Sequence, residues 1–248
     1  MDSLFLCAAL PIEVEALCRI WDIPTPTSDN PITTVDSKNP FTVKIAVSGI
    51  GLNRMEHLMN GLPPEPVFCW VSVGFAGALV PELKVGDHLS GSVVMRSNGE
   101  MILPCRADDF EFRDENRILL CNEDIVVKPG EKQTLHTRTG AVAVDLESAA
   151  VAQHARDRNE AFMWLRVISD SLEETLPRPL TRCFDAHGFP SVSAALRQLL
   201  LHPTLLSTAL RLKKRTEFLS ASLAEAVIQF VSFLKRSKAG LQTPHDSA

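Results

Sequence analysis

Three acidic residues in the sequence stand where apolar runs end. Glu13 follows the run LFLCAAL, Glu147 follows AVAVDL, and Asp170 closes the run FMWLRVIS. A carboxyl group in an apolar surround keeps its proton to higher pH, so Asp170 is suited to act as a general acid. These residue types point to acid-assisted chemistry.

The apolar runs before these acids predict the strands of one sheet. They alternate with helical patterns such as 12–21, and their β-branched residues are apolar on both faces, as in a sheet covered by helices. The predicted strands span 4–10, 41–51, 66–74, 86–97, 140–147 and 161–170. Asn98-Gly99 predicts a hairpin turn after the fourth of them. Ligands bind at the carboxyl ends of strands in open α/β sheets, so we expect one site where these strands end.

Polar or glycine-rich segments mark five of these strand ends. The segments are AALPIEVE, VSGIG, VGFAGAL, VDLES and ISDS. Each also has a purely structural explanation: Gly74 and Gly77 can form a tight turn, Glu13 can complement the helix dipole, and Asp170 can cap a loop. Five segments that converge favour a site more strongly than any one of them does.

Composition limits the class of protein. The chain has 248 residues, 45% of them hydrophobic, which suits one sizeable core. With a formal net charge of -5 and no dense basic segment, we expect no nucleic-acid partner. The six cysteines stand singly, which predicts small buried residues in a reducing cytosol and no metal site. The N-terminus lacks the basic start of a signal peptide, so we expect a cytoplasmic protein.

The predicted fold is α/β, with a single three-layer domain whose central mixed sheet is covered by helices. We assign residues 1–185 to this α/β part and residues 186–248 to a helical extension packed on the same domain, because the pattern is helical from about residue 191. The polar stretch 24–40 is predicted to be a surface connection.

Taken in order, several segments resemble the motifs of a known superfamily. AALPIEVEAL, VSGIG, VGFAGALVPELKVGDHL, GAVAVDLESAAVA and RVISDS are similar to the successive motifs of the nucleoside phosphorylase and nucleosidase superfamily, closest to its methylthioadenosine/S-adenosylhomocysteine nucleosidase branch. The resemblance covers about residues 4–175. It implies that family's fold, cleavage of the N-glycosidic bond of a purine nucleoside without metal or organic cofactor, and a homodimer.

A narrower resemblance lies in the second half of the chain. LHTRTGAVAVDLESAAVA, SDSLEETLP and the helical tail are similar to the hopanoid-associated phosphorylases. This subgroup implies release of adenine from adenosylhopane in hopanoid biosynthesis.

The superfamily resemblance gives the acids their roles. Cleavage of the glycosidic bond passes through a ribosyl cation-like state, and the leaving base must be neutralised as it departs. Asp170 is implied to protonate purine N7. Glu147 is implied to bind the ribose hydroxyl groups, with Leu146 beside the sugar, and its charge would stabilise the cation. The structural alternative for Glu147 is an acid at a helix N-terminus.

The residues around the implied nucleophile favour water over phosphate. In the hydrolytic branch an acid on the first helix activates water, and Glu13 aligns with it, while Arg166 is implied to hold the water and the acids. Bacterial phosphorylases clamp phosphate with arginines from G-D-P-x-R and from just before the V-G turn, where this chain has LPIEV and Ser72. Phosphorolysis, with phosphate as co-substrate bound by Ser48 and the backbone of GFAG, stays the alternative.

Seven further residues complete the predicted substrate contacts. They are Ser48, Ile50, Phe75, Ala76, Gly77, Ile125 and Val126. The chain departs from the family where SDSLE replaces S-D-x-A-D, where Ile125 replaces the aromatic residue against adenine, and where Phe75 replaces a serine. The bulk of Phe75 near the 5′ side of the sugar would suit an apolar 5′ substituent.

The composition of the helical tail is relevant to whether the protein contacts a membrane. Arg211, Lys213, Lys214 and Arg215 form a basic cluster beside apolar faces. This composition suits contact with the inner face of an anionic membrane, and equally a helix packed on the sheet with a solvated basic face. If the substrate is lipid-linked, the tail is expected to line the 5′ side of the pocket. A non-catalytic nucleoside-binding protein is the alternative to an enzyme, and the presence of both Glu13 and Asp170 argues against it.

Overall fold

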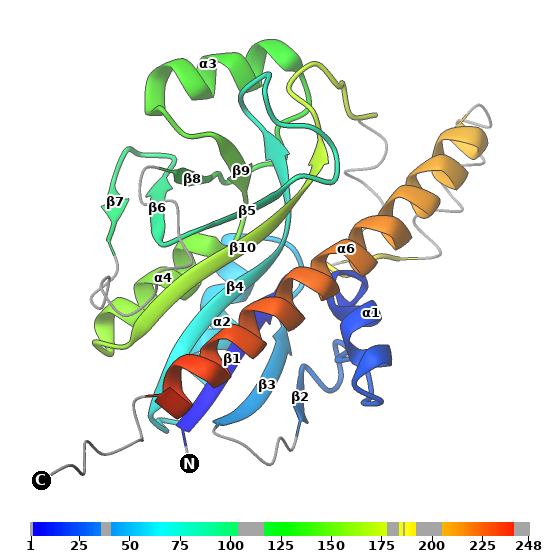
Figure 1. Ribbon diagram of the computed structural model, residues 1–248. Helices are drawn as coiled ribbons and strands as arrows, with labels where there is room; N and C mark the ends of the chain where they lie inside the picture. The colour runs from blue at the N-terminus through cyan, green and yellow to red at the C-terminus, as the bar shows by residue number, and fades with distance from the viewer. Residues whose placement is uncertain are drawn as a thin grey trace, which may run out of the picture.

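The computed structural model describes residues 2–35, 41–103, 117–177, 184–185, 187–191 and 205–240. Within them, a mixed sheet of ten strands has helices on both faces (Figure 1). In chain order the elements are β1 (Asp2–Ala8), α1 (Pro11–Ile20), β2 (Ile32–Val35), β3 (Phe41–Val47), α2 (Leu52–Gly61), β4 (Val67–Ala78), β5 (His88–Gly91), β6 (Val93–Arg96), β7 (Met101–Ile102), β8 (Ile118–Cys121), α3 (Pro129–Thr139), β9 (Ala143–Asp145), α4 (Ser148–Asp157), β10 (Ala161–Asp170) and α6 (Leu205–Gly240). The predicted α/β fold with a central mixed sheet is confirmed.

Strand β4 lies at the centre of the sheet and connects its two halves. It runs parallel to β1 on one side and to β10 on the other, and β3 continues the sheet beyond β1 in the same direction. Near its carboxyl end, β4 also pairs antiparallel with β9, where Gly77 lies opposite Val144. The carboxyl ends of β1, β3, β4 and β10 therefore meet at one edge of the sheet, the edge at which ligands bind in such folds.

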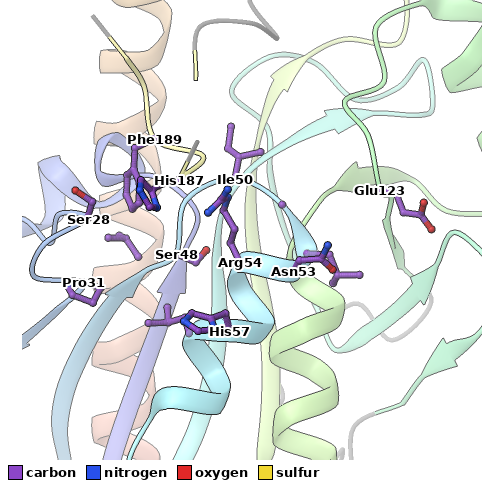
Figure 2. A pocket seen from close by; sticks show the side chains of 14 residues that line it. Ser28, Pro31, Ser48, Ile50, Asn53, Arg54, His57, Glu123, His187 and Phe189 are labelled. Carbon is purple, nitrogen blue, oxygen red and sulfur yellow. The ribbon is translucent and has the colours of Figure 1, made fainter. Parts of the chain in front are cut away.

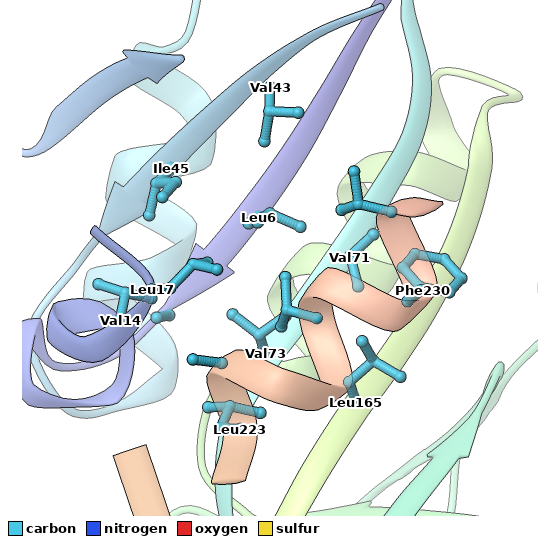
Figure 3. Close-up of a cluster of buried hydrophobic side chains, with 14 of the residues drawn as sticks. Leu6, Val14, Leu17, Val43, Ile45, Val71, Val73, Leu165, Leu223 and Phe230 are labelled. Atoms are coloured by element: carbon cyan, nitrogen blue, oxygen red, sulfur yellow. The ribbon is translucent and has the colours of Figure 1, made fainter. Parts of the chain in front are cut away.

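Two hydrophobic clusters fix the helices to the sheet. On one face α1 and α6 cover the strands, and Leu223 and Phe230 of α6 pack into the same cluster as Leu6 and Val71 (Figure 3). On the other face α2 and α4 pack into a second cluster around Trp70. Each fully buried aliphatic or aromatic side chain contributes about 1.5–3 kcal/mol. Burial on both faces holds the strand ends in place.

Helix α6 contributes apolar side chains to the hydrophobic core. Its Leu210–Arg236 segment of 27 residues contains an 18-residue window with a mean hydropathy of 1.4, so it could cross a membrane by length and composition alone. The apolar residues on its inner side, among them Leu219 and Val227, are buried against the sheet. Packing on the sheet therefore accounts for much of the apolar character of this helix.

Two short strands were not predicted from the sequence. Residues 32–35 form the edge strand β2, antiparallel to β3, inside the stretch predicted to be a surface connection. The segment 118–121 forms β8, which pairs with β6 and β9. A strand of four residues has too few alternating apolar and polar positions to be recognised in the sequence. Whether such a segment forms a strand depends on its pairing with a neighbouring strand. The hairpin at Asn98-Gly99 is present between β6 and β7, and Gly99 has φ +90°.

The cysteines agree with the prediction of small buried residues where the structure describes them. Cys7, Cys18, Cys69 and Cys121 are free and buried. Cys105 and Cys183 lie outside the described residues. Of the predicted helical tail from residue 191, α6 is described from residue 205, and residues 192–204 lie outside the described ranges.

Candidate active site

A cavity of about 210 Å³ lies where β1, β4, β9 and β10 end. It is lined by Ala9, Leu10, Glu13, Ile50, Phe75, Ala76, Gly77, Ile125, Val126, Val144, Asp145, Leu146, Glu147, Ser169, Asp170 and Leu176. All the predicted site residues except Arg166 and Ser48 are in this set. The sheet therefore brings together three acids that are far apart in the sequence.

Glu13 is held at the start of α1 by three backbone N–H groups. Pro11 opens the helix, and the Glu13 side chain folds back so that Oε2 accepts hydrogen bonds from the amides of Ala9 at 3.0 Å and Leu10 at 2.8 Å. Its other oxygen, Oε1, accepts a bond of 2.8 Å from the amide of Phe75 in β4. Burial raises the pKa of Glu13 despite these donors. A carboxyl group with a raised pKa is suited to take a proton from water.

Gly74 explains how the strand comes so near to this acid. A Cβ atom on Gly74 would lie 2.4 Å from Oε1 of Glu13. Only glycine leaves room for the carboxyl group against the strand. The tight turn that Gly74 and Gly77 could form is absent, because both lie within β4; Gly74 instead lets the acid approach the strand closely.

Glu147 lies at the N-terminus of α4 and spans the gap to α2. Its Oε1 atom accepts a hydrogen bond of 2.7 Å from the amide of Gly51. Burial, together with the negative charges of Asp145 and Glu13, raises the pKa of Glu147 to about 8. The two proposed explanations, a helix-terminal acid and a substrate ligand, are both compatible with this position, since its side chain lines the cavity.

Arg166 lies behind the cavity rather than in it. Its guanidinium donates to the carboxylate of Asp145 and, at 2.7 Å each, to the carbonyl and hydroxyl oxygens of Ser72. The prediction that Arg166 helps to hold the acids applies to Asp145. Among the described residues, no hydrogen bond joins Arg166 to Glu13, Glu147 or Asp170. The positive charge of Arg166 acts on Glu13 and Glu147 from a longer distance and offsets part of the rise that burial causes in their pKa values.

Asp145 is the residue that sequence reasoning missed here. It accepts hydrogen bonds from the amide and the hydroxyl of Ser148, at 3.1 and 2.7 Å, as well as from Arg166. The spacing of Asp145 and Glu147 offered a signal, because residues two apart in a strand project on the same side.

Asp170 has a cationic partner that was not predicted. Its Oδ2 atom accepts a hydrogen bond of 2.5 Å from Nζ of Lys132 in α3, and its Oδ1 atom accepts one of 2.6 Å from the hydroxyl of Ser169. The prediction that Asp170 has an apolar surround is therefore wrong. The sequence of α3, PGEKQTLHTRT, has Leu135 as its one large apolar residue, so no apolar face distinguished a buried lysine in it from a solvated one.

A second cavity, of about 870 Å³, lies beside the first. Ile50 lines both, and Ser48 lines only the larger one, where its hydroxyl donates to the carbonyl of Gly49 at 2.7 Å. Figure 2 shows Arg54, His57 and His187 among the side chains around it. No residue of the described part of α6 lines either cavity, contrary to the prediction for this part of the tail; residues 192–204 of the predicted segment 191–236 lie outside the described residues.

The basic cluster of α6 does not act as one surface. Arg215 donates to both carboxylate oxygens of Glu174, at 2.7 and 2.9 Å, and so ties the helix to the loop that follows Asp170. Lys213 lies 3.9 Å from Glu217 on the exposed side. Arg211 and Lys214 are exposed. One of the four residues is thus part of the packing behind the candidate site.

Metal ligands do not gather in the described ranges of the chain. No group of three or more His, Cys, Asp and Glu side chains there is arranged to hold a metal ion. The acids of the smaller cavity are instead bound by backbone amides, Lys132 and Arg166.

The raised pKa of Glu147 predicts how stability depends on pH. The folded protein keeps a proton that the unfolded chain releases between the ordinary value of 4.5 and about 8, so the free energy of unfolding falls as pH rises through this range. Glu147→Gln cannot ionise and keeps an acceptor for Gly51. We expect it to gain at least about 1 kcal/mol over the wild type between pH 5 and pH 9, measured by urea unfolding. A difference that stays constant with pH would contradict this expectation.

Solved structures with the same fold were found by comparison. The chain superposes on futalosine hydrolase of Helicobacter pylori with a TM-score of 0.67 and 16% identity over 93% of this chain and 97% of that one. It superposes on the 5′-methylthioadenosine/S-adenosyl homocysteine nucleosidase (MTAN) of Helicobacter pylori with a TM-score of 0.66 and 15% identity, over 93% of this chain and 98% of that one. For an MTAN from Chlamydia trachomatis the TM-score is 0.63 and the identity 18%, over 94% of this chain and 98% of that one.

These similarities concern the fold. No protein-family model and no curated protein matches the sequence. The solved structures nevertheless align with 93–94% of the chain. The chain therefore has the nucleoside phosphorylase-like fold of these nucleosidases.

Proposed function

We propose that this protein is a purine nucleosidase that hydrolyses the N-glycosidic bond of a 5′-substituted purine nucleoside and releases adenine. One observation carries the proposal: Glu13, Glu147 and Asp170 surround a single cavity of about 210 Å³ at the carboxyl edge of the sheet. The solved structures with this fold include enzymes named as nucleosidases and a futalosine hydrolase, which supports the same class of reaction.

Each acid has one step in the proposed mechanism. Asp170 gives a proton to N7 of the base, the C1′–N9 bond breaks with its electron pair passing to the base, and neutral adenine leaves. The ribosyl cation that forms lies beside Glu147, whose carboxyl oxygens accept hydrogen bonds from the ribose hydroxyl groups. Its negative charge adds to the stabilisation of the cation as pH rises towards its pKa of about 8. Water then attacks C1′, and Glu13 takes its proton. The protons on Glu13 and Asp170 return to their starting state by exchange with solvent.

Hydrolysis is favoured over phosphorolysis by the charge around the cavity. The residues described as lining it include acids but no arginine, lysine or histidine. Arg166, the arginine of the RVISDS motif, already binds Asp145 and Ser72. A phosphate dianion would lose its hydration beside several carboxyl groups without a guanidinium to bind it.

The larger cavity supports a bulky 5′ substituent. At about 870 Å³ it lies near the upper end of the range for small-molecule sites, about 300–1,000 Å³, and Ile50 joins it to the smaller cavity. On the sequence resemblance we propose adenosylhopane as the substrate. Polar residues such as Arg54, His57 and His187 also line the cavity, so a polar 5′ group belongs in the test.

Base release from a panel of nucleosides tests this proposal. We expect the purified protein, without added metal, to release the free purine from at least one 5′-substituted nucleoside among adenosylhopane, methylthioadenosine, S-adenosylhomocysteine and futalosine. Adenosylhopane is expected to give a kcat/KM at least about tenfold above that of methylthioadenosine, a difference of the size that apolar pocket contacts supply. A preference for methylthioadenosine removes the lipid-linked substrate. Release from none of the four removes the enzyme and leaves the nucleoside-binding alternative.

A further inference from the structure

Lys132 is a fully buried lysine to which the proposed mechanism gives no role. Its side chain has 0% exposure, and it is the buried residue of α3. Each of its three N–H bonds has an acceptor: Oδ2 of Asp170 at 2.5 Å, the carbonyl oxygen of Ser171 at 2.6 Å and that of Glu174 at 3.4 Å. A lysine is rarely buried completely unless it is paired, and here the pairing is complete.

Packing alone does not account for a lysine at this position. Removing an ammonium group and a carboxylate from water costs free energy that their attraction often does not recover, and an apolar pair of similar volume is often as stable or more stable. The partner of Lys132 is the candidate general acid, which lines the cavity. A function in the reaction therefore explains the pair better than stability does.

The two oxygens of Asp170 are held by different donors. Lys132 binds Oδ2, and the hydroxyl of Ser169 binds Oδ1 at 2.6 Å, so the plane of the carboxyl group is fixed against the cavity. The loop that supplies the carbonyl acceptors for Lys132 is itself anchored, because Arg215 of α6 binds the carboxylate of Glu174. The acid thus rests on a network that extends from α3 to α6.

We propose that Lys132 is a positioning residue for Asp170, which orients the acid and stabilises the carboxylate that it becomes; this inference rests on the proposed function. In its acid form Asp170 carries the proton on Oδ1, where it donates to Oγ of Ser169 while the Ser169 hydroxyl donates to the carbonyl of Ala76, 3.2 Å away. When this O–H bond breaks and the proton passes to N7, a negative charge forms on the carboxyl group. The ammonium at 2.5 Å acts on this charge in a site screened from water, where electrostatic interactions are strong. The stabilisation grows as the proton leaves, so it acts on kcat more than on KM.

Lys132→Met tests the inference, because methionine has a similar volume and no charge. In the full-length protein, with the best substrate of the panel, we expect kcat to fall about 10–100-fold and KM to change less than about threefold. Lys128→Met is the matched control, since Lys128 is exposed at the start of the same helix. It should leave both constants unchanged. An unchanged kcat for Lys132→Met would overturn the proposal.

A double-mutant comparison separates positioning from a general effect on the fold. If Lys132 acts through Asp170, adding Lys132→Met to Asp170→Asn should lower kcat no further, within about threefold. A further tenfold loss would contradict the inference. The double variant also carries no unpaired charge, so it gives the answer if Lys132→Met alone does not fold. Failure of the wild type to release any base is a different result, which removes the proposed function and this role together.

Discussion

Asp170→Asn is expected to lower kcat for base release by about 10²–10⁴-fold, the usual contribution of a positioned general acid. Asparagine keeps the shape of the side chain but has no acidic proton to give to N7, so the base must leave as an anion. KM should change much less, because the cavity keeps its volume. Steady-state kinetics of base release, over a range of substrate concentrations, measures both constants.

Asp157→Asn is the matched control for this variant. Asp157 ends α4 on the surface, where its carboxylate accepts a hydrogen bond from Gln153 at 2.6 Å, and it is exposed. The same change of acid to amide there should leave kcat as it was. If Asp170→Asn turns over at a rate near that of the wild type, leaving-group activation must come from another group.

Glu13→Gln is expected to lower kcat by a similar factor, about 10²–10⁴-fold, because no other group in the proposed mechanism takes the proton of the attacking water. Glutamine can keep one oxygen acceptor, so the start of α1 retains part of its hydrogen bonding. Burial raises the pKa of Glu13, so a neutral side chain here should not reduce the free energy of unfolding at alkaline pH. Kinetics and urea unfolding of the same preparation measure the two effects.

Glu15→Gln provides the comparison on the same helix. Glu15 faces solvent and pairs with Arg19 at 3.2 Å, away from the cavity. Its change to glutamine should leave kcat unaltered. A Glu13→Gln variant that loses less than about threefold in kcat would contradict the assignment of Glu13 as the base.

The strands and their acids could be predicted because their signals are local. Buried strands of the sheet give continuous apolar runs, and each acid stands directly at the end of one run or in the first helical turn after it. The carboxyl edge of a parallel sheet then brings Glu13, Glu147 and Asp170 together without any knowledge of side-chain contacts.

Partners from distant elements could not be predicted in this way. Lys132 meets Asp170 across 38 residues, and Arg166 meets Asp145 across 21. Arg166 binds Asp145 rather than Glu13 because of the directions in which the side chains of the sheet point. The periodicity of the sequence does not show these directions. The same holds for Arg215, whose basic neighbours suggested a surface although it binds Glu174.

The source of the oxygen on the released sugar tests the proposed hydrolysis most directly. The wild-type protein would be incubated with its best substrate in ¹⁸O-labelled water, once without phosphate and once with unlabelled phosphate, and the sugar product analysed by mass spectrometry. We predict equal rates in both and free ribosyl product with ¹⁸O at C1′. Base release that requires phosphate and yields a ribosyl 1-phosphate would contradict hydrolysis and show that the cavity binds phosphate without an arginine.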